Sequence, residues 1–361
     1  MRPVFLFFIL SSLLTRILVS LILLNGNLIL PPSDSTDFHN LASELSKNFS
    51  WDSFTVGWIY SYWLSIFYVL FDDSRILGLV LSCLIWFVSA IYFKKVCLLI
   101  GFNNKQVWLF LFLYCFLPSS IFYASDTLRE PYQMLFTILI VYSGIKYLRF
   151  RKSFDYIKLS LSLFCLSLLH HVFIIFAFFI LFYLALSKFS LKKTVFMFFL
   201  FSGLLITFGS LFNSYFNDSS NLFDNIEKFN EIGRSFEANS TYPILYSSNS
   251  TSVSYFISLL FTFLQYLLEP FPWRIKNGMD IVVFVENILR YILLFYVFKI
   301  LIDFKKRKAI DIDLRFLIFC FFVIEILWSI GTNNWGTAIR HHLPAVGISF
   351  LILGKIKTLN Q

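Results

Sequence analysis

The chain has 361 residues, of which 58% are hydrophobic and only 14% are charged. A soluble domain typically carries roughly 25% charged residues, so this composition excludes an ordinary soluble enzyme. The formal net charge of +9 does not indicate a nucleic-acid partner, because the basic residues stand in short clusters between apolar runs, as membrane topology signals do. The five cysteines lie in or beside apolar runs and lack metal-ligand spacing.

Long apolar runs recur along the whole sequence, and a run of about 18 residues can cross a hydrocarbon core of roughly 30 Å as a helix. We therefore predict an all-α integral membrane fold in which residues 1–361 form a single polytopic domain. The first run is too long for a typical signal-peptide core, so we expect it to be retained as a span. The runs predict about ten transmembrane helices, near residues 3–24, 76–93, 106–124, 132–148, 157–169, 172–187, 194–212, 281–302, 315–331 and 343–354.

The distribution of charge predicts the orientation of these spans. Twenty of the 30 Lys and Arg residues, but only four of the 21 acidic residues, fall at Arg2 and in five short regions. Cytoplasmic loops are enriched in Lys and Arg, so both termini and all five regions are predicted to be cytoplasmic. The five regions are residues 94–105, 146–158, 188–193, 299–315 and 355–361. The two large outer loops are then residues 25–75 and 213–280.

Two stretches need a special interpretation under this topology. Residues 156–187 would form a helix about 48 Å long, with basic regions at both ends, so we divide them into two short spans. His170 and His171 then lie at an outer turn, where they are candidate substrate-binding residues. Residues 54–71 are rich in Trp and Tyr, which favour the membrane interface, and predict a helix on the outer surface. The same position is expected for residues 253–268.

The first outer loop carries three candidate residues, Asp34, Asp37 and His39, near the start of a predicted helix over residues 36–47. An Asp at a helix start is commonly an N-cap, which is the structural interpretation. A carboxylate at the membrane surface could instead accept a proton from an attacking sugar hydroxyl. For that catalytic role Asp37 is the first choice and Asp34 the second, while His39 could orient an acceptor or bind a metal.

Two further polar motifs fall on the same predicted side. Asp126, Arg129 and Glu130 form a charged outer turn before Pro131; they are either an interfacial ion pair or a site in which Arg129 binds phosphate. The motif at 340–342 precedes the last predicted span, which would begin at Pro344.

The motif at 340–342 consists of Arg340, His341 and His342. Arginine binds phosphate through its planar fork, and histidine can hydrogen-bond a sugar. Contact with lipid headgroups is the alternative for all three residues.

Candidates also occur in the second large outer loop, residues 213–280, and inside the spans. Trp273 and Arg274 could hold a sugar ring, or Trp273 could be an aromatic-belt anchor. Glu286 and Glu325 lie inside predicted spans, where carboxylates are functional candidates by default. Glu286 and Arg290 are four residues apart and can instead pair along one helix face.

The order of these features resembles bacterial polytopic glycosyltransferases with the GT-C fold, in a pattern like that of family 39. In those proteins the first span is followed by an outer loop with an acidic residue near its start, here Asp34 or Asp37, and by membrane-parallel helices, here residues 54–71. Residues 72–102 look like the family's second span and basic exit. The stretch GTAIRHHLPAVG, residues 336–347, is similar to an Arg- and Pro-containing segment before a late span.

The resemblance implies a GT-C-like bundle of about ten helices with outer membrane-parallel helices, located in the bacterial inner membrane. It implies transfer of a sugar or oligosaccharide from a polyprenyl-(pyro)phosphate donor to a glycan or lipid-linked acceptor, on the periplasmic face, with inversion at the anomeric carbon. Arg340 and Arg129 would bind the donor phosphate. The other expected substrate contacts are His39, Asp126, Glu130, His170, His171, Trp273, Arg274, His341 and His342. The expected partners are donor, acceptor and membrane lipid, and a divalent metal is left open as a cofactor.

Other functions remain open at this point. A repeat-unit polymerase of O-antigen or capsule, of the Wzy type, would share the same chemistry and would use the outer loop 213–280 with Arg274 and Arg340. A lipid-linked glycan flippase or another transporter belongs to a different class. It predicts internal repeats and helices broken at mid-membrane, and no repeat is visible in the sequence. A non-enzymatic assembly partner would tolerate substitution of the outer motifs.

Overall fold

The computed structural model describes residues 3–25, 33–50, 58–71, 73–187, 242, 252–302, 310–332 and 334–359, and their regular elements are all helices. The α-helices are α1 (Pro3–Asn25), α2 (Ser33–Lys47), α3 (Ile59–Leu70), α4 (Arg75–Leu99), α5 (Asn104–Phe116), α6 (Pro118–Tyr123), α7 (Glu130–Phe150), α8 (Ser153–Leu169), α9 (Val172–Leu186), α12 (Ser252–Leu268), α13 (Gly278–Ile302), α15 (Ile312–Ile330) and α16 (Trp335–Leu359), with a short 3-10 turn, η2 (Pro272–Arg274).

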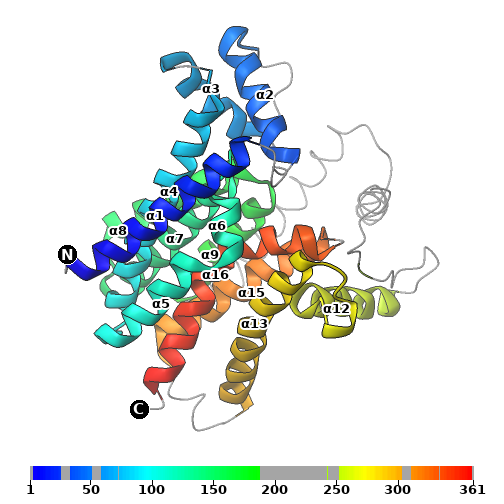
Figure 1. Cartoon of the computed structure of the whole chain (residues 1–361). Helices are drawn as coiled ribbons and strands as arrows, with labels where there is room; N and C mark the ends of the chain where they lie inside the picture. The colour runs from blue at the N-terminus through cyan, green and yellow to red at the C-terminus, as the bar shows by residue number, and fades with distance from the viewer. Residues whose placement is uncertain are drawn as a thin grey trace.

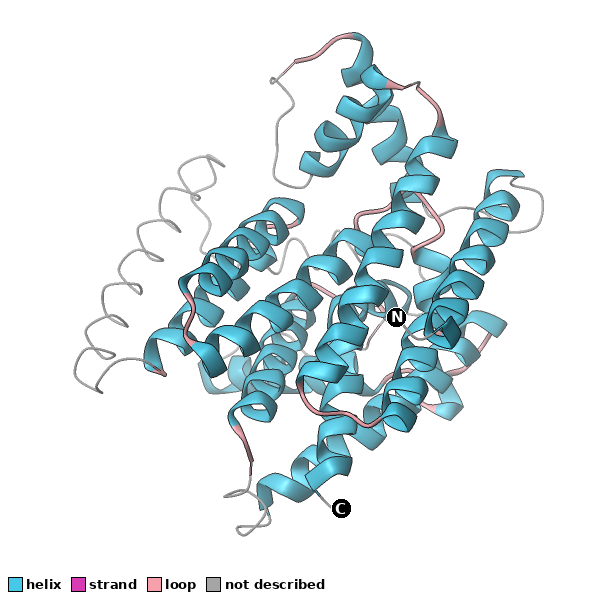
Figure 2. Ribbon diagram, turned by 90° about the vertical axis from the view of Figure 1, so that its left-hand side faces the viewer, coloured by secondary structure: helices cyan, strands magenta, loops and turns pink. Residues whose placement is uncertain are grey.

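Helix α7 occupies the middle of the bundle and packs against α4, α8, α15 and α16 (Figure 1). Helices α2 and α3 pack on each other and project beyond one end of the bundle, as both views show (Figure 2). We call this the α2–α3 end. The core between the helices combines aliphatic side chains with large aromatic ones; for example, the rings of Phe93 and Tyr114 stack with centroids 4.3 Å apart.

Three of the described helices are long and apolar enough to cross a membrane: Phe5–Asn25, Arg75–Leu99 and Gly278–Ile300. They correspond to the predicted spans 3–24, 76–93 and 281–302. Large apolar side chains such as Phe7 and Leu14 of α1 are exposed on their outer faces, as expected where lipid replaces water. These apolar helices indicate a membrane-embedded protein. The predicted span 194–212, and most of the predicted outer loop 213–280, lie outside the described residues.

The predicted single helix over residues 106–124 is wrong, because the structure has two helices there. Helix α5 ends at Phe116, Leu117 is extended with φ −63° and ψ 124°, and α6 begins at Pro118. Proline has no N–H and disfavours helical backbone in the residue before it, whereas it suits the first turn of a new helix. The break follows from that one residue.

Two buried charged side chains satisfy the backbone groups that this break leaves open. The carbonyl of Cys115 accepts from the Arg16 guanidinium at 2.9 Å, and the N–H of Ser119 donates to the Glu286 carboxylate at 2.8 Å. Unpaired backbone groups are costly inside a bilayer. Arg16 of α1 and Glu286 of α13 therefore hold the broken helix between them. Glu286 is not bonded to Arg290, whose guanidinium donates to Asn287 instead.

The start of the last helix also differs from the expectation. Asn334 caps α16, its side-chain oxygen accepting from the Thr337 N–H at 2.7 Å, so the helix begins at Trp335. Arg340, His341 and His342 consequently lie within the helix, not before it, and Pro344 is an interior residue instead of the first one. A proline there removes the helical hydrogen bond to the carbonyl of residue 340.

Other elements agree with the sequence more closely. The division of residues 156–187 into two helices is confirmed by α8 and α9, which are separated at His170 and His171. Helix α3 falls within the predicted segment 54–71, and α12 matches the predicted segment 253–268 within one residue. Helix α2 begins at Ser33, earlier than the predicted residue 36, which places Asp34 in its first turn.

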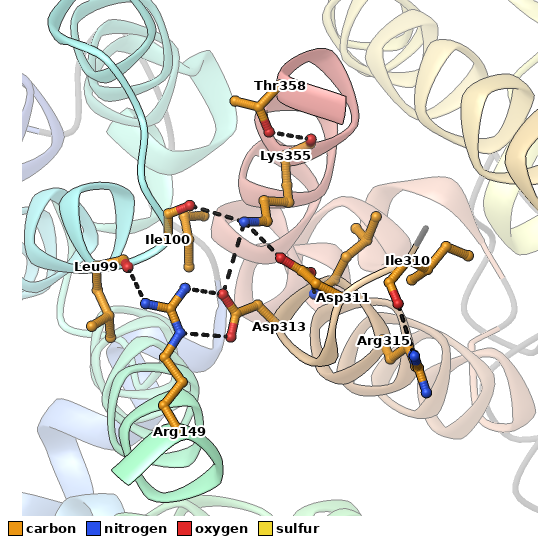
Figure 3. Close-up of polar contacts among 10 residues, drawn as sticks. Leu99, Ile100, Arg149, Ile310, Asp311, Asp313, Arg315, Lys355 and Thr358 are labelled. Carbon is orange, nitrogen blue, oxygen red and sulfur yellow. Dashed lines mark hydrogen bonds and ion pairs between the residues drawn. The ribbon is translucent and has the colours of Figure 1, made fainter. Parts of the chain in front are cut away.

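Ion pairs hold the opposite end of the bundle, where the predicted cytoplasmic regions lie (Figure 3). Arg149 at the end of α7 donates from Nε to the buried carboxylate of Asp313 at 3.0 Å and from Nη1 to the Leu99 carbonyl at 2.7 Å. Lys355 of α16 contacts Asp311 at 2.8 Å and donates to the Ile100 carbonyl at 3.1 Å. The contacts join α4, α7, α15 and α16 at this end.

The orientation from the charge bias can be tested with two exposed positions at opposite ends, Asn40 in α2 and Lys152 before α8. A thiol at Asn40→Cys should react with a membrane-impermeant maleimide added to intact cells, and one at Lys152→Cys should react only after the membrane is permeabilised. Labelling of Lys152→Cys in intact cells would invert the predicted topology.

Candidate functional site

A guanidinium at the α2–α3 end joins three helices that are distant in sequence. Arg340 of α16 donates from Nε and Nη2 to one carboxylate oxygen of Glu130, at 3.0 and 2.6 Å, and from Nη1 to Asp34 at 2.8 Å. Glu130 is the first residue of α7, and Asp34 lies in the first turn of α2. Charge-assisted bonds of this length are strong, and a carboxylate at a helix N-terminus is favoured by the helix dipole.

The two carboxylates differ in their access to solvent. The Glu130 side chain is 5% exposed, whereas the Asp34 side chain is 42% exposed. Glu130 therefore holds Arg340 from within the bundle. Asp34 occupies the open side of the same guanidinium, where an anion arriving from outside the bundle would compete with it.

A second guanidinium lies beside the first. Arg129 precedes α7, lies 5.5 Å above the Phe38 ring and donates to the Leu169 carbonyl at 3.4 Å. Burial lowers the pKa of Arg129, and the charges of Glu130, Arg340 and Asp34 act on it as well. Two guanidinium groups and two carboxylates thus lie within electrostatic reach of each other. We call Asp34, Arg129, Glu130 and Arg340 the Arg340 cluster.

Histidine and tryptophan rings form a wall next to this cluster. His341 stacks on Trp328 with centroids 3.8 Å apart, and its Nδ1 lies 2.7 Å from the Thr332 hydroxyl. His170 lies 4.7 Å from the same indole and stacks with His171 at 4.3 Å. Burial, with a smaller contribution from Arg129, lowers the pKa of His170 and of His171. At neutral pH these two rings are uncharged, so they can donate and accept hydrogen bonds without adding positive charge.

Other predicted site residues lie apart from the Arg340 cluster. The Asp37 side chain is exposed and has no hydrogen bond or ion pair with the rest of the described chain. His39 is bonded to the Tyr68 hydroxyl of α3 at 2.8 Å, and burial lowers its pKa. Asp126 is buried and pairs with Arg75 at 3.2 Å, which ties the turn before α7 to the start of α4. The His39 contact likewise joins α2 to α3.

The remaining candidates belong to the region around α12. Arg274 pairs with Glu269 and lies 4.8 Å above the Trp335 ring, while Trp273 is exposed. His342 points away from the cluster, toward Glu325 of α15 at 2.6 Å. The three basic residues of the 340–342 motif therefore serve different surroundings, because successive helix positions point in different directions.

Sequence reasoning missed several residues that shape the cluster. The Tyr123 ring of α6 lies 5.7 Å from the Arg340 guanidinium, and Phe38 and Trp328 form the other walls. Aromatic residues make up 20% of the chain, so composition could not distinguish these three. Sequence reasoning also missed Arg16, which supports the break between α5 and α6. Arg16 could have been found, because it is a single charge in the middle of the first apolar run.

Comparison with known proteins adds no relative: no family model, no curated protein and no solved structure matches the chain. The resemblance to GT-C glycosyltransferases therefore depends on the order of sequence features alone. Among the residues that the structure describes, no three His, Cys, Asp or Glu side chains gather to hold a metal ion.

The difference in burial predicts unequal contributions to stability. Glu130→Gln removes the buried carboxylate that pairs with Arg340, and breaking a buried pair costs about 3–5 kcal/mol. Asp34→Asn breaks a half-exposed contact, which is worth about 1 kcal/mol or less. In thermal unfolding of the purified protein in one detergent, Glu130→Gln should lower the Tm substantially more than Asp34→Asn. Equal shifts would show that the two carboxylates hold Arg340 equally.

Proposed function

We propose that the chain is an integral-membrane glycosyltransferase of the GT-C type. It would transfer a sugar or oligosaccharide from a polyprenyl-(pyro)phosphate donor to a glycan or lipid-linked acceptor, in surface-polysaccharide assembly. The ten-helix topology, the bacterial inner membrane and the outward-facing site belong to the same proposal. The observation that carries it is the Arg340 cluster, in which two guanidinium groups and a solvent-accessible carboxylate meet at the predicted outer end of a membrane bundle.

The proposed chemistry assigns a role to three members of this cluster, Arg340, Arg129 and Asp34. Arg340 and Arg129 bind the donor phosphate and stabilise the negative charge that grows on it as the bond to the sugar breaks. The acceptor hydroxyl forms the new bond to the anomeric carbon, and the phosphate leaves as an anion. The hydroxyl proton passes to Asp34, acting as a general base. Because a donor phosphate competes with Asp34 for Arg340, donor binding would release this carboxylate.

Asp34 replaces Asp37 as the preferred base in this proposal. Asp34 contacts Arg340 directly, whereas Asp37 lies about one helical turn further along α2, exposed and outside the Arg340 cluster. The same chemistry serves addition of one sugar and polymerisation of repeat units, so a Wzy-type polymerase remains within the proposal.

One observation favours the competing class, a lipid-linked glycan flippase or another transporter. Transporters commonly contain interrupted helices and buried charges at membrane depth. The break between α5 and α6, with the buried Arg16 and Glu286 on either side, has both properties. An assay in detergent separates the two classes, because transfer needs no sealed compartment and transport does.

The proposal predicts different effects for the two aspartates of α2. With lipid-linked glycans extracted from the source cells as donor, Asp34→Asn should lower the rate of polyprenyl phosphate release by about 100-fold or more, the usual contribution of a general base. Asp37→Asn is the matched control and should retain the parental rate. Activity in Asp34→Asn combined with loss in Asp37→Asn would return the role to Asp37, and full activity in both would remove a base from α2.

A further inference from the structure

A buried acid–base pair lies between α12, α15 and α16, separate from the Arg340 cluster. His342 Nδ1 is 2.6 Å from the carboxylate of Glu325, and His342 Nε2 is 3.1 Å from the backbone carbonyl of Tyr266. The two side chains are 3% and 1% exposed. Glu325 stands five residues before the end of α15, or about 8 Å along the helix axis. The pair is therefore inside the bundle, toward its α2–α3 end.

The hydrogen-bond geometry determines how many protons the pair holds. A backbone carbonyl only accepts, so Nε2 must carry a proton to bond Tyr266. Nδ1 and the carboxylate then need one further proton between them, either on the Glu325 carboxyl or on the imidazole. Without that proton, one of the two contacts brings two lone pairs together, and a buried polar group loses its partner at a cost of about 1–3 kcal/mol.

The Tyr266 carbonyl belongs to the end of α12, where neighbouring side chains satisfy the backbone. The last carbonyls of a helix have no partner within it. The Tyr266 carbonyl accepts from His342, the Leu268 carbonyl from the Tyr291 hydroxyl, and the Glu269 carbonyl from the Asn287 amide at 2.6 Å. Helix α12 is thus docked by three side chains of α13 and α16, of which only His342 changes its bonding with a proton.

Burial and the surrounding charged groups act in opposite directions on the proton that Glu325 and His342 share. On α13, the buried Arg290 guanidinium favours the unprotonated carboxylate. On α16, Arg340 and His341 are the two residues that come before His342 in the sequence. Beyond the end of α12, the ion pair of Glu269 with Arg274 carries no net charge. The aromatic hydroxyls facing the pair are those of Tyr266 and Tyr242. Burial opposes the net negative charge that remains once the proton leaves.

We propose that Glu325 and His342 form an intramembrane proton-binding site, and that the bound proton docks the C-terminal end of α12 against α13 and α16. When the proton leaves, the contact between His342 and Tyr266 is weakened and α12 becomes free to move. The site does not depend on the glycosyltransferase proposal, because it uses none of the residues of the Arg340 cluster. The site binds a proton, and the bound proton controls the position of α12.

Pulsed electron–electron resonance can measure that position at several pH values. Spin labels would be attached at Leu264→Cys on α12 and Leu161→Cys on α8, both exposed, with the native cysteines replaced. The parental chain should give one narrow distance distribution at pH 5.5 and a broader or shifted one at pH 9.5. In Glu325→Gln the amide N–H donates to Nδ1 while Nε2 keeps its proton, so the distribution should stay narrow throughout.

A matched control is Glu286→Gln, which changes another buried carboxylate whose bonds go to Ser119 and not to α12. It should show the parental pH response. A distribution that is unchanged by pH in the parent, or a transition in Glu325→Gln at the same pH as the parent, would overturn the proposal. So would a Glu325→Gln distribution that is broad at every pH.

Proton counting gives a second measurement that does not need the spin labels. When the purified parental chain and Glu325→Gln are titrated in unbuffered detergent from pH 5.5 to 9.5, the parent should release one more proton per chain. Identical proton release would show that the pair holds no exchangeable proton in this range.

Discussion

The arrangement at the α2–α3 end depends on the pairing of one largely buried guanidinium, that of Arg340, whose side chain is 15% exposed. A buried charge without a partner is strongly destabilising, so Arg340 requires the buried carboxylate of Glu130 beside it, and Asp34 adds a second contact at the open side. These contacts bring the starts of α2 and α7 to the first turns of α16. The capping of α16 by Asn334 places Arg340 inside the helix. It thereby determines the position along α16 at which the three helices meet. At the opposite end Arg149 and Asp313 join α7 to α15 in the same manner.

The two ends differ in the exposure of their carboxylates, and that difference separates a structural contact from a candidate site. Asp313 is almost completely buried between Arg149 and Lys355. At the α2–α3 end, Asp34 occupies the open side of Arg340, and its own side chain is 42% exposed. An anion can exchange with Asp34 without breaking the buried contact to Glu130, so ligand binding there need not cost the fold its stability.

The sequence predicted most of the helices, but not the break between α5 and α6, the start of α16, or the contacts between helices. Apolar runs identified α1, α4 and α13, and the split at His170 followed from length and charge alone. Pro118 stands within the predicted span 106–124 and was a readable signal for the break. The contact between Glu130 and Arg340 joins positions 210 residues apart, and no local pattern encodes it. The choice between Asp34 and Asp37 depended on where α2 begins.

Binding of undecaprenyl phosphate to the purified protein in detergent tests most directly the proposed role of Arg340, which is to bind a lipid-linked phosphate. The parental chain should bind it, and undecaprenol, which lacks the phosphate, should not compete. Arg340→Lys keeps the charge but loses the planar fork, so it should bind more weakly and still fold, while Arg149→Lys at the opposite end should bind as the parent does. Equal binding of the phosphate and the alcohol, or parental affinity in both Arg340→Lys and a folded Arg340→Ala, would contradict this role.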